Sequence, residues 1–467
     1  MVNWEKSMEY LGTRTALAVA SLELYDMPFV SFHPGTEING DPRFLGYYPL
    51  GMHLLAVARW LALDSTRQGY ETLAFIARDG DLPMRAYEIL RKQVPEAPVP
   101  RYLYTSRKAG MACGVFSGKE LAGLSGNLNL SACTPRQFMA MLEPVLLPDT
   151  ADYWEKQGMD LDEPFENYDS FQRTAAALAE YGWDEEGADH YRRSVAGYFA
   201  GLLKGKSAVF DIGYSGRTQE MLTRLLGRPI DGYYIHENDE SCACRQERDG
   251  FVIRSFYDYT PSITGVAREL LFSRYAPSCV GYRMEGETAV PEFEPEEFRY
   301  PVWFLMTRIQ QSALDFVEDF CQCFGQYLSR MHMRPMEVSY PYEYFLHTLT
   351  ESDAHLFDCC RFEDDLWAGS TFCLSEQWKT DIAYHRIVPF YKVVDRERFQ
   401  PVPETREERR QERYGEDLSH WFFMKQGIHR KSLLSKAAYW WAVDRSSFRN
   451  RARKHLSRNR KEGEGHE

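Results

Sequence analysis

The sequence has no apolar run as long as the roughly 18–20 residues that a helix needs to cross a bilayer. Its first residues carry no secretory signal, because residues 1–6 are polar and Glu9, Arg14 and Glu23 interrupt the segment that follows. The 10 cysteines are spread over 467 residues, and reduced thiols in a cytoplasm are the simplest interpretation of so dilute a pattern. We therefore expect a cytoplasmic protein that is not integral to a membrane.

Spacing typical of metal sites is missing as well. The Cys-x-Cys pairs at 242–244 and 321–323 have one residue between the thiols, whereas zinc sites usually have at least two. His53, His236 and His355 stand alone, and a lone histidine is more often structural than a metal ligand. We therefore predict no metal site built from these side chains and expect them to be buried or incidental.

An excess of positive charge is also missing, since the formal net charge is -13. A uniform nucleic-acid-binding surface is therefore excluded. The charge is uneven: residues 428–467 contain 11 Lys+Arg and 4 Asp+Glu, which gives +7, so the remainder carries -20. Hydrophobic residues at 44% and aromatics at 14% favour a globular body rather than extensive disorder.

The basic tail has an amphipathic pattern. Its apolar residues share one helical face, with arginines and lysines around them: Leu433, Leu434, Ala437, Trp440, Trp441 and Phe448. Tryptophan combined with basic charge favours peripheral contact with an anionic membrane. A helix docked on the acidic body is the alternative.

Short apolar runs alternate with helical patterns, which predicts an α/β fold with a mainly parallel sheet and flanking helices. The expected strands are residues 72–77, 101–105, 207–210 and 230–235, with further strands at 251–256 and 280–284. The expected parts are an α/β core (1–133 and 205–290), a helical insertion (134–204), a helix-rich C-terminal domain (291–400), a charged linker (401–427) and the tail (428–467).

The best candidate site follows the strand at 207–210 and reads Asp-Ile-Gly-Tyr-Ser-Gly-Arg-Thr-Gln from position 211. Parallel sheets bind ligands at the carboxyl ends of their strands, and a glycine loop that enters a helix presents N–H groups to a phosphate. The predicted phosphate ligands are Gly213, Ser215, Gly216, Arg217 and Thr218, with Gln219 as a further candidate. Asp211 is expected to accept from sugar hydroxyls or to hold a hydrated Mg²⁺. A tight strand–helix turn with an aspartate cap is the alternative.

This loop resembles the phosphate loop of type I phosphoribosyltransferases, in which two acids precede three residues and Thr/Ser-Gly-x-Thr. Asp211 matches the second acid and Ser215-Gly216-x-Thr218 matches the loop, but Phe210 replaces the first acid. The resemblance implies a phosphoribosyltransferase-like core. It also makes Arg78-Asp79-Gly80, after the strand at 72–77, a counterpart of the pyrophosphate-side loop.

Other charged residues lie where neighbouring strands end. We expect Arg78 and Asp79 to form a site with Asp211, or else a structural salt bridge at a turn. Arg107 follows the strand at 101–105 and is expected to bind phosphate, with a solvated basic turn as the alternative. The helical pattern around Glu269 favours an internal ion pair with Arg268 or Arg274; the alternative is an acid that faces the site.

Five segments, at 45–60, 75–80, 102–107, 211–219 and 269–272, carry a broader resemblance. In this order they resemble the region downstream of the hydrolase domain in haloacid-dehalogenase-like proteins of bacterial surface-polysaccharide gene clusters. No Asp-x-Asp-x-Thr/Val nucleophile loop follows a strand, so that phosphatase mechanism is not expected. Asp160-Leu161-Asp162 lies in polar sequence typical of a surface turn.

These observations predict an enzyme-like protein of surface-polysaccharide biosynthesis that binds a phosphorylated sugar or nucleotide-type ligand. The reaction would be a glycosyl or phosphoribosyl transfer, with Asp211, Arg78 and Asp79 as the catalytic candidates. The alternative is a non-catalytic scaffold that partners a glycosyltransferase at the membrane. Convergence of Arg78, Arg107 and Asp211 on one open cleft would favour the enzyme, whereas dispersion of these residues, or their burial in mutual ion pairs, would favour the scaffold.

Overall fold

A computed structural model describes residues 16, 19, 40–124, 133–213, 215–237, 239–257, 265–295, 297–348, 350–363, 371–373 and 375. Its centre is a five-stranded parallel sheet with the strand order β2-β1-β3-β4-β5. The strands are β1 (Thr72–Ile76), β2 (Val99–Leu103), β3 (Ser207–Asp211), β4 (Asp231–Tyr234) and β5 (Ile253–Ser255). The predicted α/β class is therefore confirmed.

The strand order determines where the two halves of the sheet diverge. The chain runs from β1 to β2 on one side of it and then crosses from β2 to β3 on the other side, the strand order of flavodoxin-like sheets. In such sheets ligands bind outside the carboxyl ends of the strands at this switch point. β1 and β3 pair from Thr72 with Ser207 to Phe75 with Phe210, so their carboxyl ends lie side by side.

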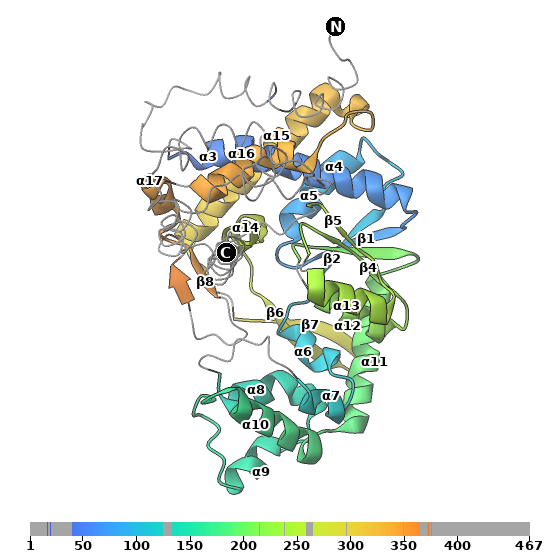
Figure 1. The fold of residues 1–467 in the computed structure, drawn as a ribbon, viewed down its shortest axis with the longest axis vertical. Helices are drawn as coiled ribbons and strands as arrows, with labels where there is room; N and C mark the ends of the chain where they lie inside the picture. The colour runs from blue at the N-terminus through green and yellow to red at the C-terminus, as the bar shows by residue number, and fades with distance from the viewer. Residues whose placement is uncertain are drawn as a thin grey trace, which may run out of the picture.

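One helical layer packs on the face of the sheet that includes Leu73, Phe75 and Phe210. Its elements are α3 (Pro42–Leu45), the π-helix η1 (Gly46–Leu50), α4 (Gly51–Arg67), α5 (Asp81–Arg91), α14 (Gly265–Phe272), α15 (Tyr300–Phe324), η3 (Gly325–Tyr327), α16 (Pro335–Thr348), α17 (Glu351–Ala354) and η4 (His355–Phe357). These helices share one apolar core with the strands, although they come from both ends of the described chain (Figure 1).

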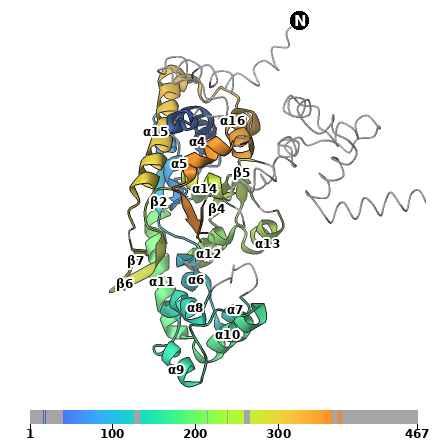
Figure 2. The ribbon, with the colours of Figure 1, turned by 90° about the vertical axis from the view of Figure 1, so that its left-hand side faces the viewer.

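The opposite face, which includes Ala74, Ile76 and Val209, packs against a second apolar core. Its elements are α6 (Ala109–Gly114), α7 (Gly118–Ala122), α8 (Pro135–Leu142), η2 (Glu143–Val145), α9 (Thr150–Lys156), α10 (Tyr168–Tyr181), α11 (Glu185–Leu202), α12 (Arg217–Leu226) and an antiparallel hairpin of β6 (Cys279–Glu285) and β7 (Thr288–Phe293). Both ribbon views place α8, α9 and α10 at the opposite end of the molecule from α4, α15 and α16 (Figure 2).

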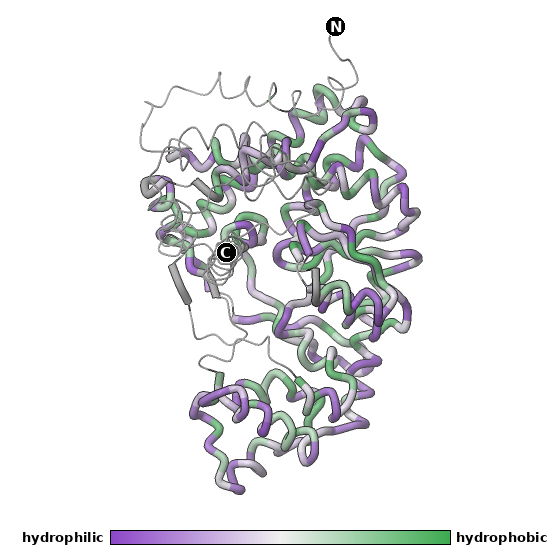
Figure 3. The backbone as a smooth tube through the Cα atoms, viewed as in Figure 1, coloured by the Kyte–Doolittle hydropathy of each residue, from purple (hydrophilic) through white to green (hydrophobic). Residues whose placement is uncertain are grey.

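The remaining elements are α13 (Asp239–Asp249), which packs on α12, and a two-stranded sheet of β8 (Arg361–Glu363) and β9 (Thr371–Cys373). Apolar stretches run through the central strands and the helices beside them (Figure 3). None of the helices in the described part of the chain combines the length and apolar character that crossing a bilayer requires. The predicted linker at 401–427 and the predicted tail at 428–467 lie outside the described residues.

Candidate functional site at the switch point

The loop after β1 carries the first candidate residues. It turns sharply into α5, and the Gly80 N–H donates to the Ile76 carbonyl at 2.7 Å. A β-carbon at Gly80 would lie 2.6 Å from that carbonyl oxygen, so the turn has no room for a side chain there. The Ala77–Arg78 peptide bond is cis. Arg78 is exposed and Asp79 is half-buried, directly past the carboxyl end of a central strand.

Helix α14 reaches the same loop from a distant part of the chain. The Ser273 hydroxyl donates to Asp79 Oδ1, and the Arg274 N–H donates to the Arg78 carbonyl at 3.1 Å. Ser273 directly follows α14 and lies four residues after Glu269, so the two side chains project from the same side of the helix. These bonds hold the end of α14 at the sheet edge and bring Glu269 to it.

β3 ends at Asp211 and runs into the predicted phosphate loop. The Gly213 N–H donates to Asp211 Oδ1 at 3.4 Å, which turns the loop back toward the strand end. Gly213 has a φ of 127°, and a β-carbon there would lie 2.3 Å from the His236 carbonyl oxygen, so only glycine fits. Gly216, with a φ of 75°, is the N-cap of α12. The loop therefore brings the positive end of the α12 dipole to the edge where Asp211 lies.

Asp79, Asp211 and Glu269 form an acidic cluster at this edge, and each is half-buried. Burial raises the pKa of Asp211 to about 7, and the charge of Asp79 adds to this rise. Two loop N–H groups and the charge of Arg107 oppose it. Asp211 therefore exchanges its proton near neutral pH, as a general acid or base requires.

The other two acids respond to the same neighbours. Burial raises the pKa of Glu269 to about 8, and the charge of Asp79 contributes while Arg107 and Arg78 oppose the rise. Burial also raises the pKa of Asp79, against the hydrogen bond from Ser273 and the charges of Arg78 and Arg107. Arg107 therefore acts on all three acids and Arg78 on Asp79 and Glu269. The cluster brings together residues from β3, from α14 and from the loops that follow β1 and β2.

Three arginines, Arg78, Arg107 and Arg217, lie in the loops around this edge or at the start of α12, and all three are exposed. Arg78 donates to the Ala276 carbonyl at 3.2 Å. Partial desolvation and the positive charges of Arg245 and Arg107 lower the pKa of Arg217, although its side chain is exposed and Glu220 opposes the shift. Within the described chain, Arg78, Arg107 and Arg217 belong to none of the ion pairs, and neither do the three acids. Cations that form no ion pair within the described chain are available to an anionic ligand.

The remaining predicted loop residues differ in their surroundings. Ser215 and Thr218 are half-buried, and the Ser215 carbonyl accepts from Arg245 Nη1 at 3.1 Å. Gln219 is fully buried, and its Oε1 accepts from the Tyr234 hydroxyl. Gln219 therefore packs beneath the loop against β4 instead of reaching the edge of the sheet.

The prediction that Glu269 pairs with Arg268 or Arg274 is wrong. Arg268 instead forms a fully buried, bidentate pair with Glu343, with N–O distances of 2.7 and 2.8 Å. Arg274 approaches Asp81 at 4.0 Å. Successive helical residues point about 100° apart, so Arg268 faces the core while Glu269 faces the site. The pair between α14 and α16 positions Glu269 without contacting the site itself.

Two neighbours of the site were not predicted. Ser273 has a weak sequence signal, since it lies one helical turn after Glu269. Arg245 lies on α13 and binds Glu220 through Nε at 2.7 Å. Its position beside Arg217 depends on the packing of α13 against α12, which no local pattern indicates.

In the described part of the chain, no group of three or more His, Cys, Asp or Glu side chains is arranged to hold a metal ion. Comparison with known proteins adds no family: no family model matches the chain, and no curated protein matches it. The argument for function therefore rests on the geometry and charge of the site.

Proposed function

We propose that the protein is a transferase-like enzyme of bacterial surface-polysaccharide biosynthesis that binds a phosphorylated sugar or nucleotide-type ligand at the switch point between β1 and β3. One observation carries this proposal: Asp79, Asp211 and Glu269 interact with Arg78 and Arg107 at one sheet edge, yet form no ion pairs there. The resemblance of the sequence to surface-polysaccharide proteins supports the pathway.

The cationic side of the site would bind the phosphates. Arg107 and Arg217 repel one another, so a phosphate or pyrophosphate between them relieves that repulsion. The N–H groups at the start of α12 add further donors, together with the hydroxyls of Ser215 and Thr218. Mg²⁺, where bound, would share ligand phosphate oxygens with one or two of the carboxylates, as this ion usually does.

The acidic side of the site would handle the proton of the transfer. Asp211, with a pKa of about 7, is largely ionised just above neutral pH and would accept the proton of an attacking hydroxyl. Glu269, with a pKa of about 8, keeps its proton at that pH and would donate a hydrogen bond. Arg78, Arg107 and Arg217 would stabilise the charge that develops on the leaving phosphate.

A scaffold without catalytic activity is the second candidate, and Phe210 favours it. Phe210 occupies the position of the first acid in the phosphoribosyltransferase loop, and it is fully buried in the core shared with α4 and α5. The site therefore has one carboxylate fewer for the ribose hydroxyls than that family.

Ligand-induced stabilisation tests the proposal. Phosphoribosyl pyrophosphate, nucleotide sugars and inorganic pyrophosphate are added with and without Mg²⁺, and the unfolding temperature is measured. A ligand at about 100 times its dissociation constant adds roughly 2.7 kcal/mol of stability. The shift should disappear in Asp211→Asn and in Arg107→Gln.

Matched controls separate the site from general charge effects. Asp315→Asn on α15 and Arg101→Gln on β2 change the same charges away from the switch point, so their shifts should equal that of the wild type. If the well-folded wild type responds to none of the ligands, the proposed ligand binding is wrong and the non-catalytic scaffold is the remaining candidate.

A further inference from the structure

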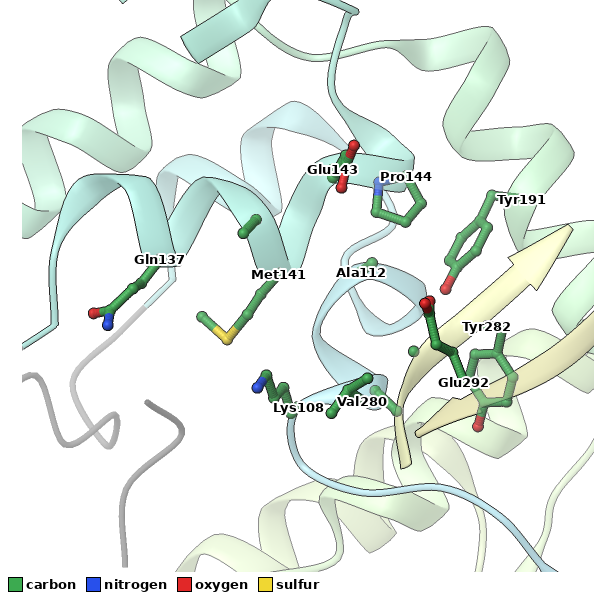
Figure 4. Close-up of a pocket in the computed structure, with 13 residues that line it drawn as sticks. Lys108, Ala112, Gln137, Met141, Glu143, Pro144, Tyr191, Val280, Tyr282 and Glu292 are labelled. Atoms are coloured by element: carbon green, nitrogen blue, oxygen red, sulfur yellow. The ribbon is translucent and has the colours of Figure 1, made fainter. Parts of the chain in front are cut away.

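A cavity of about 380 Å³ lies between α6, α8, η2, α11 and the β6–β7 hairpin (Figure 4). This volume is within the range of about 300–1,000 Å³ that is usual for small-molecule sites. Lys108 lines the cavity and directly follows Arg107, which acts on the acidic cluster. The loop between β2 and α6 therefore contributes to both the cavity and the phosphate-type site.

Tyr191 lines this cavity from α11. Only 3% of its surface is exposed, its hydroxyl has no hydrogen bond of good geometry among the described residues, and the Tyr282 backbone N–H lies close enough to lower its pKa. Figure 4 shows the hydroxyl directed toward the Glu292 carboxylate. Burial is the main cause of the raised pKa of Tyr191, and the charge of Glu292 makes a smaller contribution. A buried hydroxyl without a partner costs free energy, which a ligand with polar groups would recover.

The charge of the cavity differs from that of the switch-point site. Glu143 and Glu292 contribute two carboxylates, whereas Lys108 is the one cation among the lining residues and already approaches Glu294 at 3.5 Å. Such a cavity repels phosphates but accepts hydrogen bonds from ligand hydroxyls. The apolar part of the wall, from Met141, Pro144 and Val280, suits the C–H face of a sugar ring.

We propose that this cavity is the acceptor subsite and binds a neutral, polyhydroxylated carbohydrate through the Tyr191 hydroxyl and the Glu292 carboxylate. Its role as an acceptor site rests on the group transfer proposed above, since the sugar hydroxyl would attack a donor held at the switch point. Binding itself requires only the residues of the cavity.

Saturation-transfer difference NMR on the full chain tests the binding. The probes are methyl α-glucopyranoside, methyl β-galactopyranoside and methyl α-rhamnopyranoside, with glucuronate as an anionic comparison. We expect a signal from at least one neutral pyranoside and a weaker one from glucuronate. Tyr191→Phe and Glu292→Gln should each weaken binding about tenfold or more, as loss of one hydrogen bond to a buried or charged group predicts.

Two controls keep the result interpretable. Glu287→Gln removes a carboxylate from the same hairpin outside the cavity, where its side chain is 90% exposed, and should leave binding unchanged. Inorganic pyrophosphate binding, measured by calorimetry on each variant, reports on the switch-point site, and far-UV circular dichroism of each variant reports on folding.

The outcomes separate the two proposals. Pyrophosphate binding without any pyranoside signal would overturn the acceptor subsite and leave the proposed function standing. A pyranoside signal that survives both cavity variants would also overturn it, because the sugar would then bind elsewhere. A pyranoside signal that depends on both cavity residues would support the subsite even where pyrophosphate fails to bind, and the failure would then concern the switch point alone.

Discussion

The carboxyl group of Asp211 binds its proton more tightly in the folded chain than in the unfolded one, because burial and the charge of Asp79 raise its pKa to about 7 from 3.8. The stability linked to this proton is present below the unfolded pKa and is lost as the pH rises toward 7. Glu269 acts in the same direction, since its pKa rises to about 8 from 4.5. The acidic cluster therefore lowers the stability of the folded chain above neutral pH, where its carboxylates are charged. Perturbed pKa values of this kind are common at functional sites.

Asp211→Asn should stabilise the protein at pH 8 and have little effect near pH 4. One pKa unit corresponds to about 1.4 kcal/mol. Because solvent screens a half-buried group, we expect the free energy of unfolding to rise by roughly 1–2 kcal/mol, less than the full pKa shift would give. The free energy of unfolding in urea, measured at several pH values, checks this. Asp315→Asn should show no such pH dependence, and a destabilised Asp211→Asn at pH 8 would contradict the unfavourable charge.

The residues of the site also show how far the sequence alone reaches. Asp211, Arg78 and Arg107 follow strand-like runs, and parallel strands bring their carboxyl ends together, so their convergence follows from local patterns and topology. The partners of Arg268 and Asp79 could not be predicted in this way. Both partners lie far along the chain, and long-range pairing depends on helix packing that local sequence does not encode.

At the scale of elements, the predictable parts are those with strong local signals. β1 is predictable from its short apolar run. The run is continuous because all five residues of the strand are buried, on both faces of the sheet. The segment at 280–284 was expected as a strand, and it forms β6 of a separate hairpin. Its antiparallel partner β7 was not predicted, because Pro291 and Glu292 interrupt its apolar pattern.

The close contact between η1 and α15 depends on a glycine. A β-carbon at Gly46 would lie 2.1 Å from the Ile309 carbonyl oxygen, which belongs to the backbone and cannot rotate away. Gly46→Ala should therefore force the two helices apart and cost about 1–3 kcal/mol of stability.

Gly197 is the matched control for this substitution. It lies within α11, and a β-carbon there would meet nothing within 4 Å. Gly197→Ala should stabilise the protein by up to about 1 kcal/mol, because alanine favours a helix over glycine. Thermal unfolding of both variants checks the pair, and equal effects of the two substitutions would show that helix propensity alone decides them.

At the scale of the whole molecule, one sheet serves two apolar cores. Alternate residues of β1 enter different cores, with Leu73 on the side of α4 and α15 and Ile76 on the side of α6 and α11. If the strands come apart when one helical layer unfolds, the other layer loses the face of the sheet on which it packs. We therefore expect the two layers to unfold together, even though the chain between β2 and β3 forms a helical region of its own.

Leu73→Ala and Leu103→Ala test this coupling with the same chemical change on opposite faces. Both leucines are fully buried, one in each core, and each truncation should cost about 2–5 kcal/mol. Because the strands are shared, both variants should lower the midpoint of one common transition. Far-UV circular dichroism and tryptophan fluorescence follow it together, since Trp60 packs on the first core and Trp154 and Trp183 on the second. A Leu103→Ala variant that loses part of its helical signal in a separate, earlier transition would show instead that the second layer folds as an independent domain.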